Sequence, residues 1–185
     1  MSHELLTFVI ALLALLNPIG SGIIYLGLTK SLPKEVQDRI QRNCVMTIAI
    51  ILLISAWIGT LILKLFGITL GAFELAGGFI VLLTALSMVR GAGENTDQYA
   101  NSGSSASLGI VPLALPIVAG PGAISAVIIY TQQLPDTLDR AWISLICIGM
   151  AILMGLVFKA APWLGKLLGE EGGKVVSRIM GIILA

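Results

Sequence analysis

Long apolar runs recur along this chain, and they constrain its fold more than any other feature. Five of them are each close to the ~20 residues that a helix needs to cross the hydrocarbon core of a bilayer. Because lipid offers no hydrogen-bond partner to the backbone, each run is expected to be helical. Five runs are complete, and a sixth begins near Val175 and is still apolar at Ala185: residues 5–28, 43–66, 72–90, 110–130, 141–158 and 175–185.

Composition excludes the main soluble classes. Of the 185 residues 57% are apolar and 11% are charged, against about 45–50% and ~25% in a soluble domain. The net charge of +1 provides no basic surface for nucleic acid. His3 is the single histidine, and Cys44 and Cys147 are the only cysteines. We therefore expect an integral membrane protein without enzymatic activity, metal or cofactor, whose surface contacts the lipid bilayer.

The distribution of basic residues predicts an orientation. If the six helices alternate in direction, nine Lys and Arg residues fall on one side and two on the other, which is a positive-inside bias. The connections 29–42, 91–109 and 159–174 are then cytoplasmic, and the N-terminus lies outside. The two groups are Lys30, Lys34, Arg39, Arg42, Arg90, Lys159, Lys166, Lys174 and Arg178 on the cytoplasmic side, and Lys64 and Arg140 on the other.

Internal similarity divides the chain into two halves. At an offset of 103, Pro18 matches Pro121, Cys44 matches Cys147 and Gly78 matches Gly181. The Gly- and Ser-rich stretch 91–109 resembles a flexible linker between them. We predict a first three-helix repeat at 1–90 and a second at 110–185. Since three helices are an odd number, the second repeat is inverted, as in many secondary transporters. We expect the sixth helix to continue beyond Ala185.

Two of the predicted helices carry a helix-breaking motif near the bilayer centre. The first helix contains Asn17-Pro18-Ile19-Gly20-Ser21, and the fourth contains Gly120-Pro121-Gly122 with Ser125 one turn later. Proline lacks an N–H group and clashes with the carbonyl four residues earlier, so Pro18 is expected to free the carbonyl of Ala14 and Pro121 that of Ile117. The candidate substrate-binding residues are Asn17, Pro18, Gly20, Ser21, Gly120, Pro121, Gly122 and Ser125.

Such a pair of breaks has the chemistry to bind a zwitterion. Free carbonyls attract an ammonium group, and the N–H groups of the following half-helices, at 20–23 and 122–125, attract a carboxylate. No charged residue lies near the centre of any run, so the substrate should be neutral overall. A coupling ion, H⁺ or Na⁺, would be held by carbonyl and hydroxyl oxygens or would use charges near the helix ends. The alternative is purely structural, because Pro and Gly also kink and pack membrane helices.

Several motifs along the chain together resemble a known family. They are Ala14-Leu15-Leu16-Asn17-Pro18-Ile19-Gly20, Leu65-Phe66-Gly67-Ile68, Ala76-Gly77-Gly78, the run from Pro112 to Ser125, and Arg178-Ile179-Met180-Gly181. In these motifs the chain resembles the MarC family of integral membrane proteins (UPF0056) over nearly its whole length. The resemblance implies a six-helix protein of the bacterial inner membrane, classed with transporters of small neutral amino acids such as glycine and alanine.

The sequence therefore predicts an all-α bundle of six transmembrane helices, whose first and fourth helices are broken near the midplane. Its predicted function is secondary transport of small neutral amino acids across the inner membrane. Two rivals remain open at this point. One is an exporter of drugs or metabolites on the same scaffold, and the other is a membrane scaffold subunit that transports nothing.

Overall fold

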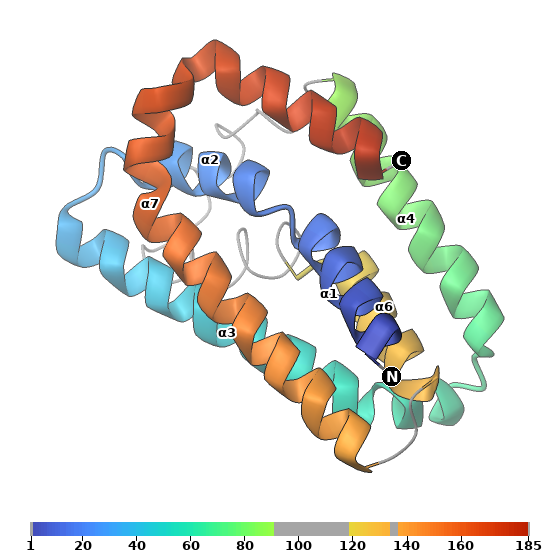
Figure 1. The fold of residues 1–185 in the computed structure, drawn as a ribbon. Helices are drawn as coiled ribbons and strands as arrows, with labels where there is room; N and C mark the ends of the chain where they lie inside the picture. The colour runs from blue at the N-terminus through green and yellow to red at the C-terminus, as the bar shows by residue number, and fades with distance from the viewer. Residues whose placement is uncertain (1, 91–118, 134–136, 185) are drawn as a thin grey trace.

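The structure is a computed structural model that describes residues 2–90, 119–133 and 137–184 (Figure 1). These residues form α-helices, and no strand occurs among them, so the prediction of an all-α protein is confirmed. The linker 91–109 and the first part of the predicted fourth helix, with Pro112 and Pro116, lie outside the described residues. The helices are α1 (Ser2–Leu16), α2 (Pro18–Thr29), α3 (Lys34–Leu65), α4 (Leu70–Arg90), α6 (Pro121–Gln133) and α7 (Thr137–Leu184).

Four segments of the described chain are long and apolar enough to cross a membrane, with α1 and α2 counted as one. They are Glu4–Thr29, Lys34–Leu65, Leu70–Ser87 and Leu138–Trp163. The helix α3 starts at Lys34 rather than near residue 43, so most of the predicted connection 29–42 is helical. At 1.5 Å per residue α3 is about 48 Å long. Since the hydrocarbon core is ~30 Å thick, its charged first turns extend into the aqueous phase.

The C-terminal third differs from the sequence-based prediction. Separate helices were expected over 141–158 and from Val175, but α7 is continuous from Thr137 to Leu184. The expected connection begins with good helix formers, Lys159 to Ala161, and the helix continues through them and beyond. Pro162 lies inside α7 and removes one backbone hydrogen bond, which is a standard cause of a kink. Figure 1 shows α7 turning between its orange and red parts, after which it approaches α4.

The centre of the bundle is formed by α6 and α7. The helix α7 packs against α1, α2, α3 and α4, and α6 packs against α1, α3 and α4. Two hydrogen bonds show that α3 and α7 are antiparallel. Near the start of α3, Gln41 Nε2 donates to the Gly155 carbonyl oxygen at 2.7 Å, and near its end Trp57 Nε1 donates to Ser144 Oγ at 3.0 Å. The fully buried core side chains include Phe8, Leu12, Ile40, Cys44, Ile48, Ile143, Cys147 and Met154.

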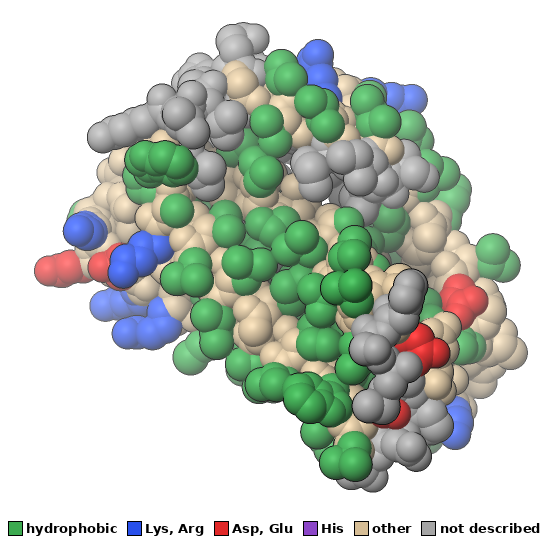
Figure 2. Space-filling view, viewed as in Figure 1, with side chains coloured by type: hydrophobic (Ala, Val, Ile, Leu, Met, Phe, Trp, Pro, Cys, Tyr) green, Lys and Arg blue, Asp and Glu red, His purple; other side chains and the backbone are tan. Residues whose placement is uncertain are grey.

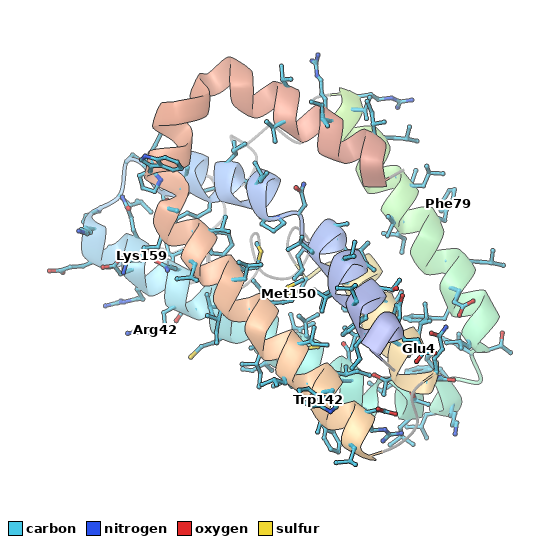
Figure 3. The ribbon with its side chains drawn as sticks, in the orientation of Figure 1. Glu4, Arg42, Phe79, Trp142, Met150 and Lys159 are labelled. Carbon is cyan, nitrogen blue, oxygen red and sulfur yellow. The ribbon has the colours of Figure 1, made fainter. Side chains whose placement is uncertain are left out.

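Charged and apolar side chains separate on the surface as lipid contact requires. Figure 3 places Arg42 and Lys159 together at one end of the α3–α7 pair and Glu4 and Trp142 near the other. In Figure 2 hydrophobic side chains cover the area between these ends. Large apolar side chains are exposed along the outer faces of both helices, among them Ile50, Ile54 and Leu61 on α3 and Leu145, Ile152 and Leu156 on α7.

Candidate functional site

The first predicted break is present, and it lies between α1 and α2. Asn17 has φ 44° and ψ 68° and is the only residue other than glycine with a positive φ in the described part of the chain. Asparagine tolerates this left-handed conformation better than most residues. Asn17 is fourteenth of the 26 residues of the span Glu4–Thr29, so the break falls at its middle. Pro18 occupies the first turn of α2, where its missing N–H costs nothing.

Local groups satisfy the backbone at this break. The N–H of Asn17 donates to the carbonyl oxygens of Leu13 at 3.1 Å and Ala14 at 3.2 Å. The Ser21 hydroxyl donates to the Leu16 carbonyl oxygen at 2.9 Å. The expectation that Pro18 leaves the Ala14 carbonyl free was therefore wrong. The left-handed Asn17 acts as a helix C-cap, which directs its own N–H back onto α1.

Asn17 also caps the helix that follows. Its Oδ1 accepts a hydrogen bond from the Gly20 N–H at 3.2 Å, and its carbonyl oxygen accepts one from the Ser21 N–H at 2.9 Å. These two N–H groups were expected to face a bound carboxylate, and that expectation was also wrong. A Cβ at Gly20 would meet the Asn17 carboxamide, with Cγ at 3.0 Å and Oδ1 at 3.1 Å. Glycine is thus required at position 20 for Asn17 to cap α2.

The start of α6, where the second break was predicted, lies directly beside the first break, while the residues before 119 lie outside the described part of the chain. The helix α6 begins at Pro121, and the Gly120 carbonyl oxygen accepts the Ile124 N–H at 3.2 Å. A Cβ at Gly122 would lie 3.2 Å from Leu15 Cδ2 of α1 and would collide with Val81 Cγ2 of α4. Since Leu15 is twelfth of the 26 residues of its span, Gly122 shares the depth of the first break. In the first turn of α6, Pro121 has no N–H, and the N–H groups of Gly122 and Ala123 have no intrahelical acceptor.

Ser125 differs from the other buried hydroxyl residues on the described helices. The hydroxyls of Thr29, Ser55 and Thr131 each donate to the carbonyl four residues earlier, at 2.7–2.8 Å. Ser125 is 5% exposed, and its Oγ has no hydrogen-bond partner among the described residues. Instead Oγ lies against Gly77 of α4. A buried hydroxyl without a partner is costly, so Ser125 is the strongest candidate for a contact with a bound molecule.

The structure thus brings the two predicted half-sites together but divides their roles. Asn17, Gly20 and Ser21 are buried and hold the first break by internal hydrogen bonds. Gly122 and Ser125 face α1 and α4. Sequence reasoning did not assign Gly77 and Val81 to the site, although Ala76-Gly77-Gly78 was noticed. Two adjacent glycines inside an apolar helix were a usable signal of close helix contact.

These features define a polytopic α-helical membrane protein with non-helical backbone buried inside its bundle. The family described as "MarC family integral membrane protein" matches residues 2–185. The chain belongs to this MarC family, also called UPF0056.

Curated relatives agree with the family assignment. The UPF0056 membrane protein YhcE of Escherichia coli K12 is 36% identical over 182 residues, which cover 96% of this chain and 84% of the relative. A UPF0056 membrane protein of Buchnera aphidicola subsp. Schizaphis graminum is 35% identical over 179 residues, with 96% and 84% covered. MJ1677 of Methanocaldococcus jannaschii is 34% identical over 178 residues, with 94% and 86% covered. No solved structure matches this chain.

Proposed function

We propose that the protein is a secondary transporter of small neutral, zwitterionic amino acids in the bacterial inner membrane, with its N-terminus outside. The observation that carries the proposal is the meeting of the mid-span break at Asn17 with the start of α6, beside a buried hydroxyl. Leu15, at the end of α1, lies 3.2 Å from the Cβ position of Gly122, and Ser125 Oγ has no partner among the described residues. Irregular backbone at membrane depth persists where it is buried in protein or lines a polar cavity.

The chemistry of this region favours a neutral substrate. The first turn of α6 offers N–H groups to a carboxylate, and Ser125 Oγ can accept or donate one hydrogen bond. Asn17, Pro18, Gly20 and Ser21 shape the opposite side, and Gly120 and Pro121 begin the α6 side. No charged residue lies near the centre of the spans, so a substrate with net charge would lack a counter-charge. We assign the protein no enzymatic role, metal or cofactor, and we leave the coupling ion, H⁺ or Na⁺, to experiment.

Burial patterns support the inverted repeat that this transport mechanism uses. Pro18 and Pro121, which are 103 residues apart, are the first residues of α2 and α6. At the same offset, α3 and α7 bury equivalent positions. The exposed fractions are 0% for both Ile40 and Ile143 and for both Cys44 and Cys147. In this proposal one repeat rocks against the other around the site between them.

Counterflow in proteoliposomes tests the proposal without assuming a coupling ion. Vesicles are loaded with unlabelled glycine or alanine, and entry of the labelled amino acid is followed. We expect transient accumulation that Ser125→Ala reduces at least tenfold and Ser55→Ala leaves unchanged. Ser55 is the matched control, because it is also buried but its hydroxyl is bonded to the Ile51 carbonyl. No accumulation by folded protein would reject amino acid transport and favour the exporter or scaffold alternatives.

A further inference from the structure

The helix α4 presents two residues to the start of α6. Gly77 and Val81 are four residues apart and therefore share one face of α4, and Gly122 and Ser125 share one face of α6. The contacts pair them in antiparallel order. Ser125 Oγ lies against the Cβ position of Gly77, and Val81 Cγ2 lies against that of Gly122. Gly78, the neighbour of Gly77, has open space at its Cβ position.

From this line of contacts between α4 and α6, called the α4–α6 seam, we propose that Gly77 and Val81 form the third wall of the substrate site. They would limit the size of the substrate side chain. The inference deepens the proposed function and rests on it. Small residues alone would indicate only close packing of α4 on α6. The additional observation is Ser125, which is 5% exposed, has no partner among the described residues and has its Oγ at this seam. In this proposal a bound ligand forms a hydrogen bond with the Ser125 hydroxyl, which explains a buried polar group at this contact.

The geometry sets the direction of the size limit. Gly122 lies between Leu15 of α1 and Val81 of α4, so little width remains where α6 begins. A substrate held by the first N–H groups of α6 and by Ser125 would direct its side chain toward Val81. The methyl groups of Val81 then exclude larger side chains. One methylene in an apolar pocket changes selectivity by about 10- to 200-fold.

Competition in the counterflow assay tests this wall. Unlabelled leucine competes against labelled alanine in the parent protein, in Val81→Ala and in the control Leu83→Ala, whose side chain is half exposed on α4. We expect the ratio of leucine to alanine inhibition to rise at least tenfold in Val81→Ala only. We also expect Gly77→Ala to reduce alanine accumulation at least tenfold, while Gly78→Ala leaves it unchanged. If Gly77→Ala does not fold, the Val81 and Leu83 pair decides the question.

A reversible cross-link supplies a second measurement. The Cβ position of Gly122 is 3.8 Å from Val81 Cβ, which is within the range for a disulfide. V81C and G122C, introduced together in a Cys44→Ala, Cys147→Ala background, should oxidise, and the oxidised protein should show less counterflow than the same protein after reduction. Unchanged selectivity in Val81→Ala, or undiminished flux in the oxidised protein, would show that Gly77 and Val81 do not form a wall of the site. Transport by the parent protein would still support the proposed function in that case. No transport by the folded parent would overturn both.

Discussion

The Asn17 side chain and the Gly20 N–H form a hydrogen bond of 3.2 Å that starts α2 in the middle of a membrane span. The same residue ends α1, because its own N–H donates to the Leu13 and Ala14 carbonyls. One left-handed asparagine therefore satisfies backbone groups on both sides of the break. Leu15, two residues before this break, packs against Gly122 of α6.

Two substitutions at Asn17 should distinguish the contribution of its side-chain cap to stability from that of its left-handed backbone conformation. Asn17→Ala loses the cap, worth about 1 kcal/mol, and also places alanine in a left-handed conformation, which costs a further ~1 kcal/mol. Asn17→Gly adopts this conformation freely and should lose only a few tenths of a kcal/mol. The free energy of unfolding, from SDS titration of detergent-solubilised protein followed by circular dichroism, measures both. Equal losses for the two variants would contradict the role of the left-handed backbone.

The break at Asn17 and Pro18 could be predicted from sequence because a proline removes its hydrogen bond wherever the chain folds. The sequence could not predict which backbone groups the break leaves without a hydrogen-bond partner. They depend on the dihedral angles of Asn17, which bring its Oδ1 to Gly20 and its N–H to Ala14. A local motif thus predicted that the helix is interrupted, but not which hydrogen bonds satisfy the backbone groups at the interruption.

The α4 face of the candidate site was missed for a different reason. Gly77 and Val81 belong to the site only because the register between α4 and α6 places them against Ser125 and Gly122. Register between helices is a tertiary property that spacing along one helix does not reveal. The continuity of α7 was missed because charge and glycine at 159–174 were interpreted as a connection. Ser125, which follows Pro121 by about one helical turn, is buried, and its role in substrate binding stays a prediction.

Close packing of α3 on α7 predicts opposite effects for two glycines of α7. A Cβ at Gly155 would lie 2.8 Å from Val45 Cγ2, and the branched valine side chain has little freedom to move away. Gly155→Ala should therefore destabilise the protein by about 1–3 kcal/mol. Gly149 has nothing within 4 Å of its Cβ position, so Gly149→Ala should be neutral or stabilise by up to ~1 kcal/mol. SDS unfolding of the two variants gives the comparison, and a loss at Gly149 as large as that at Gly155 would reject this packing.

The antiparallel register of α3 and α7 can be tested by cross-linking. The Cβ position of Gly155 lies 4.0 Å from Val45 Cβ, which suits a disulfide. V45C and G155C, together in a Cys44→Ala, Cys147→Ala background, should cross-link rapidly on oxidation. A protease site inserted in 91–109 allows detection, because the two halves stay joined on a non-reducing gel only if the bond has formed. V45C with G149C is the matched control. Efficient cross-linking of that pair instead would contradict this register of α3 and α7.

Labelling of single cysteines from one side of the membrane tests the topology on which the inverted repeat depends. Three candidate spans precede residue 91, and an odd number places the N-terminus and the 91–109 segment on opposite sides. In the Cys44→Ala, Cys147→Ala background, S2C should react with a membrane-impermeant maleimide in intact spheroplasts, and S102C should react only after permeabilisation. The reverse pattern would keep the repeat but invert the orientation predicted from the basic residues. Reaction of both cysteines from one side would require an even number of crossings before residue 91, and two three-helix repeats could not then be inverted.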